Sequence, residues 1–331
     1  MPWMNKSIDL CGLGNALVDI QFRVDDKVIG ESGLAKGEMR LAGKEEQSVL
    51  IKKLSHLSSH KCSGGSAANT IIAFSQFGGK SAYMTMLGND DNGRFYAGEF
   101  SELGIELSTE YLDSEPTGTC LVLITPDSER TMYTCLAATS HFRKENLNGE
   151  LIAKSKWLYI EGYSFSQDHT TDAIYEAVQT AKNNGAKVSV TFSDVFVTQV
   201  FRDQLMNVVK QSDLVFCNEN EALAFSGKTN IGDAMEFLSG LCPNVVITLG
   251  SKGALVLWEG FKYNIPPYPA QPVDSTGAGD MFAAGFLYGI IYFADPEKAG
   301  KLASVAASKV ISSMGARLEN TIAGQLLKEI D

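Results

Sequence analysis

The sequence predicts an α/β fold, a doubly wound, mostly parallel β-sheet flanked by helices, with a small β-sheet lid. Two observations favour this fold. Beyond residue 150, short apolar runs typical of buried strands alternate with helical patterns, and such alternation builds right-handed βαβ units around a parallel sheet. Before residue 150, two strands of partial alternation flank a turn at residues 126–129, which is typical of a hairpin in a separate, smaller sheet.

The first predicted element is a buried strand at residues 8–14. Strands of partial alternation follow at 38–41, 120–125 and 131–135, and the last two form the hairpin. In the second half, the predicted strands cover residues 157–160, 188–192, 214–217 and 245–249, and the predicted helices cover residues 171–183, 198–210 and 231–241. A late hairpin at 254–258 and 261–265 and two long helices at 279–293 and 296–312 complete the chain. Residues 1–331 thus form a single domain, whose lid we place at about residues 15–45 and 110–137.

The composition excludes several classes of protein. With 331 residues, 44% of them hydrophobic, the chain can fill a real core, which excludes disorder as its dominant state. Its 39 acidic and 28 basic residues give a net charge of −11, so its surface repels the phosphate backbone of nucleic acids. Six cysteines without C-x-x-C spacing argue against zinc and disulfide scaffolds, and no apolar run is long enough to span a membrane. We expect a cytoplasmic protein that binds neither nucleic acid nor membrane.

Some glycine-containing segments resemble phosphate-binding loops but lack a required residue. Gly12 and Gly14 follow a strand, as in a dinucleotide fingerprint, yet Leu17 stands where the third glycine would be. The segments that end at 79–81 and 227–229 lack the first glycine of a Walker A loop. A NAD-linked dehydrogenase is therefore the most distant of the alternative functions.

The strongest chemical signal is the segment 274–280, Asp-Ser-Thr-Gly-Ala-Gly-Asp, which runs directly into an apolar helix. Gly277, Ala278 and Gly279 leave consecutive backbone N–H groups unobstructed at the positive end of the helix dipole, and such a turn binds an anion. Asp280, in the first helical turn, is placed to accept a proton from a hydroxyl that attacks phosphorus. The alternative is a glycine-rich turn in which Asp280 only complements the helix dipole.

Two further segments have the character of a sugar site. Gly64 and Gly65 allow a small ligand to touch the backbone, and Asn69 offers both a donor and an acceptor to sugar hydroxyls. The alternative is an ordinary turn with Ser66 as the helix cap. Asp19, just past the first strand, is able to accept two hydrogen bonds from a vicinal diol, at the place where ligands gather in such sheets. The alternative for Asp19 is a solvated turn.

Two segments of the second half suit a nucleotide. Asn218 and Glu221 follow a strand one helical turn apart, and their oxygens suit Mg²⁺ near a nucleotide phosphate, although Asn218 is also a good helix cap. Thr248, Gly250 and Gly253 form a strand end and a glycine turn over which a nucleotide can pass, but any tight turn has the same pattern.

These segments, in this order and spread over residues 11–317, resemble the PfkB-type carbohydrate kinases, the family of ribokinase and adenosine kinase. The resemblance implies a ribokinase-like body with a β-sheet lid, and transfer of phosphate from ATP, with Mg²⁺, to a sugar or nucleoside hydroxyl. It implies that Asp280 is the base and that residues 277–279 form the anion hole. It places the sugar against Asn15, Asp19, Gly64, Gly65 and Asn69. It places the phosphates and Mg²⁺ near Asn218 and Glu221, and Glu221 would act through water. It places the nucleotide along Thr248, Gly250, Gly253, Ala307 and Val310.

Within the family, several features resemble adenosine kinases more than free-sugar kinases. One is the segment 14–19, and another is Arg130 on a predicted lid strand. An arginine there would bridge the transferring phosphates bidentately; the alternative is a solvated hairpin charge. A third is Tyr163, in the segment where adenosine kinases hold aromatic side chains against the substrate base, although a serine at 164 interrupts the adjacent aromatics expected there. Activation by a monovalent cation such as K⁺ is common in the family, and Asp274 and Thr276 match part of such a site.

The sequence thus predicts a phosphotransferase, an ATP-dependent kinase for the primary hydroxyl of a ribose unit, with an adenosine-like nucleoside as the favoured acceptor. A free-sugar kinase, similar to ribokinase or fructokinase, is the alternative. A second alternative is a non-catalytic sensor that binds sugar or nucleotide, against which the intact Asp280 and the pair Asn218 and Glu221 argue. The protein is expected to act on a small molecule as a monomer or a homodimer.

Overall fold

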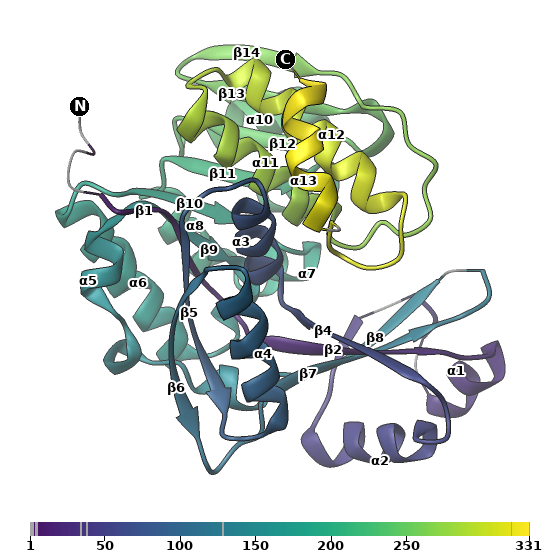
Figure 1. The fold of residues 1–331 in the computed structure, drawn as a ribbon. Coiled ribbons are helices and arrows are strands. Elements are labelled where there is room, and N and C mark those ends of the chain that lie inside the picture. The colour runs from purple at the N-terminus through teal and green to yellow at the C-terminus, as the bar shows by residue number, and fades with distance from the viewer. Residues whose placement is uncertain are drawn as a thin grey trace.

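The computed structural model describes residue 3 and residues 6–33, 35–37, 39–127, 129–318 and 320–330. Within them the chain forms one large sheet of nine strands and one small sheet of five (Figure 1). From edge to edge, the large sheet consists of β14 (Phe261–Ile265), β13 (Ala254–Trp258), β12 (Val245–Thr248), β11 (Leu214–Asn218), β10 (Lys187–Thr191), β9 (Ser155–Glu161), β1 (Ile8–Leu13), β5 (Ser81–Gly88) and β6 (Glu106–Leu112). All neighbours pair in parallel except β12 with β13 and β13 with β14. The predicted α/β fold and its late hairpin are confirmed.

Helices cover both faces of the large sheet, which explains why its central strands are continuous apolar runs. One hydrophobic core lies on the side of α3 (Ser66–Gln76), α4 (Asp91–Glu102), α11 (Ala278–Tyr292) and α12 (Pro296–Ile311). The other core lies on the side of α5 (Gly149–Ala153), α6 (Asp168–Asn183), α8 (Arg202–Val209), α9 (Glu219–Ser226) and α10 (Ile231–Ser239). The C-terminal α13 (Asn320–Glu329) contacts α12. No helix in the described part of the chain is long and apolar enough to cross a membrane.

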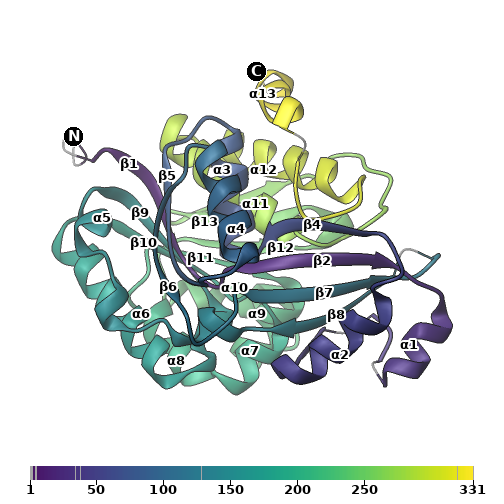
Figure 2. The same ribbon diagram turned by 60° about the horizontal axis from the view of Figure 1, so that its bottom comes forward.

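The small sheet projects from the body. Its order is β3 (Met39–Leu41), β8 (Arg130–Cys135), β7 (Gly118–Ile124), β2 (Leu17–Arg23) and β4 (Ser59–Gly64). Figure 2 shows β2, β4, β7 and β8 reaching outward beside α1 (Asp26–Ser32) and α2 (Lys44–Leu54). Gln47 of α2 donates to the carbonyl oxygens of Thr119 and Tyr133 at 3.0 and 2.7 Å, so α2 is fixed to the sheet.

The observed elements differ from the sequence predictions in the small sheet and in one helix. β4 lies outside both predicted lid ranges, and β6, which the second range overlaps, pairs with β5 in the large sheet. The helix predicted at 198–210 is two helices, α7 (Val195–Val200) and α8, because the β-branched residues of α7 have low helix propensity and Phe201 leaves the helical region with φ −109° and ψ 29°. Residue 38 of the strand predicted at 38–41 and residue 128 of the turn predicted at 126–129 lie outside the described residues.

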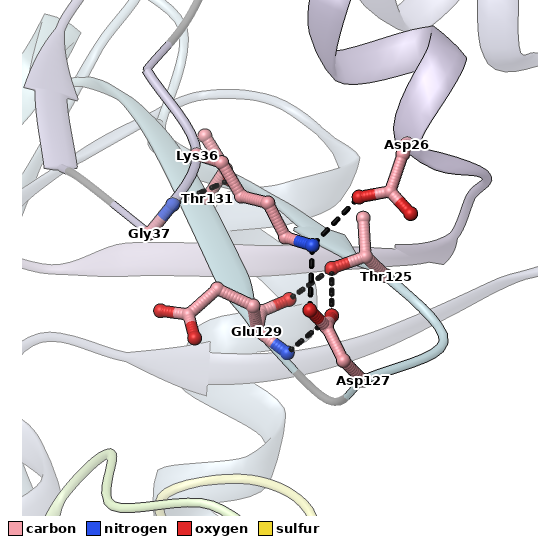
Figure 3. Close-up of polar contacts among 7 residues, drawn as sticks. All are labelled: Asp26, Lys36, Gly37, Thr125, Asp127, Glu129 and Thr131. Carbon is pink, nitrogen blue, oxygen red and sulfur yellow. Dashed lines mark hydrogen bonds and ion pairs between the residues drawn. The ribbon is translucent and has the colours of Figure 1, made fainter.

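The tip of the small sheet is held by a charged network (Figure 3). Lys36 Nζ donates to Asp26 at the start of α1 and to Asp127 in the β7–β8 turn, both at 2.6 Å. Asp127 also accepts from the hydroxyl of Thr125 at 2.6 Å. Because these side chains are largely exposed, the network contributes little free energy, but it joins three separate segments.

Two glycines on α11 allow this helix to touch the backbone of α12. A Cβ on Gly289 would lie 2.4 Å from the Cα of Ala299, and a Cβ on Gly285 would lie 2.8 Å from the Cα of Ala303. Backbone atoms cannot move aside as the end of a flexible side chain can. Side chains at these positions would therefore force the two helices apart.

We predict that Gly289→Ala lowers the free energy of unfolding by about 1–3 kcal/mol, because the added methyl group overpacks the helix interface. Denaturant titration measures this change. The matched control is Gly98→Ala on α4, where no heavy atom lies within 4 Å of the added Cβ, and where alanine should raise stability by about 0.5–1 kcal/mol. Equal effects of the two substitutions would contradict the close approach of the helices.

Candidate active site

A cavity of about 980 Å³ opens between the small sheet and the carboxyl ends of the central strands. Glu161, Asn218 and Thr248, each the last residue of its strand, line it, as expected for an α/β sheet. Asp19 and Arg130 contribute from the small sheet. The cavity brings together these residues predicted from the sequence: Asn15, Asp19, Gly65, Asn69, Arg130, Tyr163, Asn218, Glu221, Thr248, Thr276, Gly277, Ala278, Gly279 and Asp280.

Asp280 lies in the first turn of α11 and lines the cavity. Its Oδ1 accepts a hydrogen bond from Ser66 Oγ at 2.6 Å, and its Oδ2 accepts one from Asn69 Nδ2 at 3.0 Å. Burial raises the pKa of Asp280 to about 6, and the two hydrogen bonds oppose part of that rise. The carboxylate is therefore ionised at neutral pH and able to accept a proton.

The two glycines before Asp280 have different roles. Gly277 adopts φ 76°, in the left-handed region, and a Cβ on it would lie 2.7 Å from the Cβ of Ala316, so the backbone requires glycine there. Gly279 faces open space. The N-terminus of α11 faces the cavity. The first N–H groups of a helix lack partners within the helix, although here the N–H of Ala278 bonds to the carbonyl of Ser275 at 3.3 Å. Such a helix end attracts an anion.

Asp19 on β2 projects over the neighbouring strand at Gly64. A Cβ on Gly64 would lie 2.6 Å from Asp19 Oδ1, so this glycine makes room for the carboxylate rather than lining the cavity itself. Burial raises the pKa of Asp19 to about 6.

Gly65 adopts φ 106°, and a Cβ on it would lie 2.2 Å from the carbonyl oxygen of Asn15, a position that only glycine fits.

No sequence motif singled out Glu161, a fully buried carboxylate in the cavity wall. Its Oε1 accepts from the backbone N and the Nδ2 of Asn15, both at 2.7 Å, and its Oε2 accepts from the backbone N of Ala67 at 2.6 Å. Burial raises its pKa to about 7. The only sequence signal was an acidic residue that ends an apolar strand. The side chain of Asn15 is held at both ends of its amide, because Nδ2 donates to Glu161 and Oδ1 accepts from Thr139 Oγ1 at 3.3 Å.

Arg130 is not a solvated hairpin charge. The side chains of Arg130 and Asp274 are 5% and 3% exposed, and Nη1 lies 2.5 Å from Oδ2. The backbone N–H groups of Thr276 and Gly315 also donate to Asp274, at 3.0 and 2.9 Å. Burial opposes the charge on Asp274, but these N–H groups and the guanidinium hold its pKa below the usual range. The ion pair joins the small sheet to the turn before α11.

Asn218 and Glu221 form a reciprocal cap at the start of α9. Asn218 Oδ1 accepts from the backbone N of Glu221 at 2.9 Å, and the two oxygens of Glu221 accept from the backbone N and Nδ2 of Asn218 at 2.9 and 2.7 Å. Burial raises the pKa of Glu221 to about 7. Both residues also line the cavity, so the capping role and a ligand-binding role are compatible.

Gly250, Gly253 and Ala307, all within the described part of the chain, lie outside the cavity wall. Gly253 adopts φ 90°, and a Cβ on it would lie 2.0 Å from the carbonyl oxygen of Ile265, so the fold itself requires this glycine. Ala307 packs against the core from α12, and Val310 is fully buried there. Of the residues predicted to lie along the nucleotide, the structure brings only Thr248 to the cavity.

Tyr163, which the sequence indicated, and Phe196 and Phe201, which no motif indicated, form one wall of the cavity. Tyr163 donates from its hydroxyl to Asp194 Oδ2 at 3.4 Å, and Asp194 Oδ1 accepts from the backbone N of Phe196 at 2.7 Å. The rings of Phe196 and Phe201 meet edge-on with centroids 5.9 Å apart. Phe201 lies within the helix predicted at residues 198–210, and Phe196 lies just before it. The small sheet adds the apolar side chains of Met39, Leu41 and Met132 to the same cavity, and Leu136, just after β8, adds another.

The described residues contain no group of three or more His, Cys, Asp or Glu side chains arranged to hold a metal ion. All six cysteines are free. Carboxylates nevertheless surround the cavity, at Asp19, Glu161, Asp194, Glu221 and Asp280. Such an oxygen-rich wall suits a hydrated divalent cation rather than a metal held by protein ligands alone.

A helix N-terminus and a carboxylate share one cavity at the carboxyl ends of the strands, an arrangement suited to phosphoryl transfer. Residues 37–322 match the sequence model of the pfkB family carbohydrate kinases, and the chain belongs to this family. It is therefore a phosphotransferase that acts on a hydroxyl group of a carbohydrate or nucleoside. The family implies ATP as the phosphate donor, usually with Mg²⁺.

Individual relatives have both nucleoside-kinase and sugar-kinase names. The chain resembles the crystal structure of adenosine kinase from Sinorhizobium meliloti with a TM-score of 0.90 and 32% identity, over 98% of this chain and 99% of that chain. It resembles a probable sugar kinase from Rhizobium etli CFN 42 with a TM-score of 0.90 and 29% identity, over 98% of each chain. Adenosine kinase from Saccharomyces cerevisiae is 26% identical over 324 residues, which cover 92% of this chain and 94% of that protein.

We predict that Arg130→Ala lowers the free energy of unfolding by about 3–5 kcal/mol, because it leaves a buried carboxylate without its charged partner. The matched control is Arg40→Ala on β3, whose pair with Glu46 is 55% and 51% exposed and should contribute at most about 1 kcal/mol. Denaturant titration compares the two. An Arg130→Ala protein as stable as the Arg40→Ala protein would show that Asp274 does not depend on the guanidinium.

Proposed function

We propose that the protein is an ATP-dependent kinase that phosphorylates the primary hydroxyl of a ribose unit, with an adenosine-like nucleoside as its acceptor. The observation that carries this proposal is the position of Asp280, an ionised carboxylate at the N-terminus of α11 in the cavity that Asp19 and Asn69 also line. A base beside an anion-binding helix end is what phosphoryl transfer to a hydroxyl requires.

In this proposal Asp19 and Asn69 bind the ribose hydroxyls, and Gly64 and Gly65 shape the pocket around them. The primary hydroxyl gives its proton to Asp280 while its oxygen bonds to the γ-phosphorus, and the bond from that phosphorus to the leaving ADP oxygen breaks. The backbone of residues 277–279 stabilises the charge on the transferred group. Ser66 and Asn69 keep Asp280 oriented toward the reaction.

Mg²⁺ would neutralise phosphate charge near Asn218 and Glu221. Both oxygens of Glu221 already accept hydrogen bonds from Asn218, so Glu221 would hold the cation through water.

A monovalent cation at Asp274 and Thr276 is not part of the proposal, because Arg130 and two backbone N–H groups already hold the Asp274 carboxylate. Arg130 Nε is itself buried and has no hydrogen-bond partner among the described residues.

The aromatic wall favours a nucleoside over a free sugar. Tyr163, Phe196 and Phe201 line the cavity from the body, opposite apolar side chains of the small sheet such as Leu41. A nucleobase presents flat apolar faces to such walls, whereas a free sugar presents hydroxyls. The free-sugar kinase remains the second candidate, because Asp19 and Asn69 would bind either acceptor.

The test is a panel of acceptors supplied with ATP and Mg²⁺, with ADP release as the readout. We expect kcat/KM to be highest for adenosine or a close analogue. A higher kcat/KM for ribose or fructose would replace the nucleoside by the sugar alternative. Tight binding of sugars or nucleotides without ADP release for any acceptor would favour a sensor.

We predict that Asp280→Asn lowers kcat by about 10²–10⁴-fold, because the amide keeps the shape of the side chain but cannot accept a proton. The melting temperature and the affinity for ATP should stay near those of the wild type. In the wild type, kcat should fall about tenfold per unit below roughly pH 6, as Asp280 becomes protonated. A folded variant with normal turnover would remove Asp280 from the role of base.

We predict that Phe196→Ala raises the KM for a nucleoside by roughly tenfold through lost ring contact, while the KM for ATP and the residual activity on ribose change little. Phe196 is 48% exposed, so its removal should not destabilise the fold. The control is Phe261→Ala on edge strand β14, 69% exposed and away from the cavity, which should change neither constant. An unchanged nucleoside KM in Phe196→Ala would weigh against this wall as the base site.

A further inference from the structure

We propose that Glu161 is a positioning residue of the kinase: it ties the turn after β1 to the first turn of α3, and through α3 it fixes the two side chains that orient Asp280. The inference rests on the proposed function for the role of Asp280, but not for the tie itself. Glu161 ends β9, so it contributes from a third segment of the chain. No motif in the sequence involves it.

The tie consists of three N–H donors converging on one carboxylate. Asn15 donates twice to Oε1, from its backbone and from its side chain, and the backbone of Ala67 donates to Oε2, all between 2.6 and 2.7 Å. Glu161 is 0% exposed, so water does not compete for these bonds. Because every partner is a donor, the carboxylate form accepts all three as charge-assisted hydrogen bonds.

Gly14 provides the room for this carboxylate. A Cβ on Gly14 would lie 2.7 Å from Cδ of Glu161 and 2.8 Å from the Cβ of Ala67. The backbone of Gly14 is not in the left-handed region, so glycine is needed there for space and not for conformation. The fold therefore keeps a place for the Glu161 side chain at the junction of β1 and α3.

Glu161 would affect the reaction through its hydrogen bond to the start of α3. The helix begins after Gly65, which supplies no side-chain cap, and Glu161 takes over that function from another strand by accepting from Ala67. Ser66 and Asn69, in the same first turn, donate to the two oxygens of Asp280. A displacement at the start of α3 thus moves both partners of the proposed base, and displacements of about 1 Å can cost roughly 10²-fold in rate.

The first experiment compares Glu161→Gln with Asp9→Asn. Glutamine has the same shape but only one acceptor oxygen, so at least one of the three N–H groups must face its NH₂ group. Asp9 is the matched control: it is also a buried carboxylate on β1, at the far end of the strand, where it accepts from the backbone of Lys80 at 2.9 Å and pairs with Lys156.

For Glu161→Gln we expect kcat to fall roughly 10- to 100-fold and the acceptor KM to rise, with the KM for ATP unchanged. For Asp9→Asn we expect a lower melting temperature with kcat and both KM values unchanged. Wild-type constants in folded Glu161→Gln would overturn the proposal. So would a Glu161→Gln protein whose only change, as in the control, is its melting temperature.

A second variant and a second readout keep the proposal testable if Glu161→Gln does not fold. Gly14→Ala leaves the carboxylate chemically intact but pushes it aside, so it should reproduce the fall in kcat and the rise in acceptor KM. Unchanged constants in Gly14→Ala would contradict the tie. Hydrogen exchange at the amides of Asn15 and Ala67 should quicken in both variants and stay slow in Asp9→Asn.

Hydrogen exchange also separates this inference from the proposed function, because it needs no substrate. If the wild type phosphorylates no acceptor of the panel, the proposed function fails, while quickened exchange at Asn15 and Ala67 would still support the tie. If the wild type is an active kinase and exchange at these amides in Glu161→Gln matches the wild type, the tie alone fails.

Discussion

The hydrogen bonds between the first turns of α3 and α11 are the interaction on which the rest of the site depends. Ser66 and Asn69 donate to the carboxylate of Asp280, and the hydroxyl of Thr70 donates to its carbonyl oxygen at 3.2 Å. Two helix starts that are more than 200 residues apart in the chain are thereby held face to face. In the proposed function the acceptor lies on the side of α3 and the phosphates on the side of α11, so the geometry of transfer would be set where these helices meet.

The second constraint on the site is its own negative charge. Burial raises the pKa of Asp19 and Asp280 to about 6 and of Glu161 and Glu221 to about 7, from 3.8 and 4.5. Between those values the folded protein binds protons that the unfolded chain has released, so these groups make folding less favourable as the pH rises through that window. A cation that enters with the nucleotide phosphates relieves the repulsion. This negative charge is consistent with the proposed entry of the nucleotide together with a cation.

The sequence predicts what local backbone chemistry dictates. The turn 274–280 and its helix, the alternating strands and helices of the second half and both hairpins follow from periodicity and glycine placement. It does not predict contacts between distant segments. Arg130 and Asp274 are 144 residues apart, and Glu161 looks like the end of an ordinary buried strand. The glycines illustrate the same limit, because Gly253 serves the packing of β14 while Gly64 makes room for Asp19.

The crossings between the two sheets add a constraint on how they can move. The chain passes between the sheets at residues 14–16, 65, 113–117 and 136, and these crossings lie against one another. A Cβ on Gly118 would lie 2.7 Å from the carbonyl of Leu136 and 2.8 Å from that of Ala16. Any rotation of the small sheet against the body therefore pivots at this narrow neck. The Arg130–Asp274 pair, with Arg130 at the start of β8, lies away from the neck, so it helps to hold the face of the small sheet close to the turn before α11. A buried ion pair thus contributes to the width of the cavity, and the orientation of the Asp280 carboxylate depends on the hydrogen bonds at the start of α3.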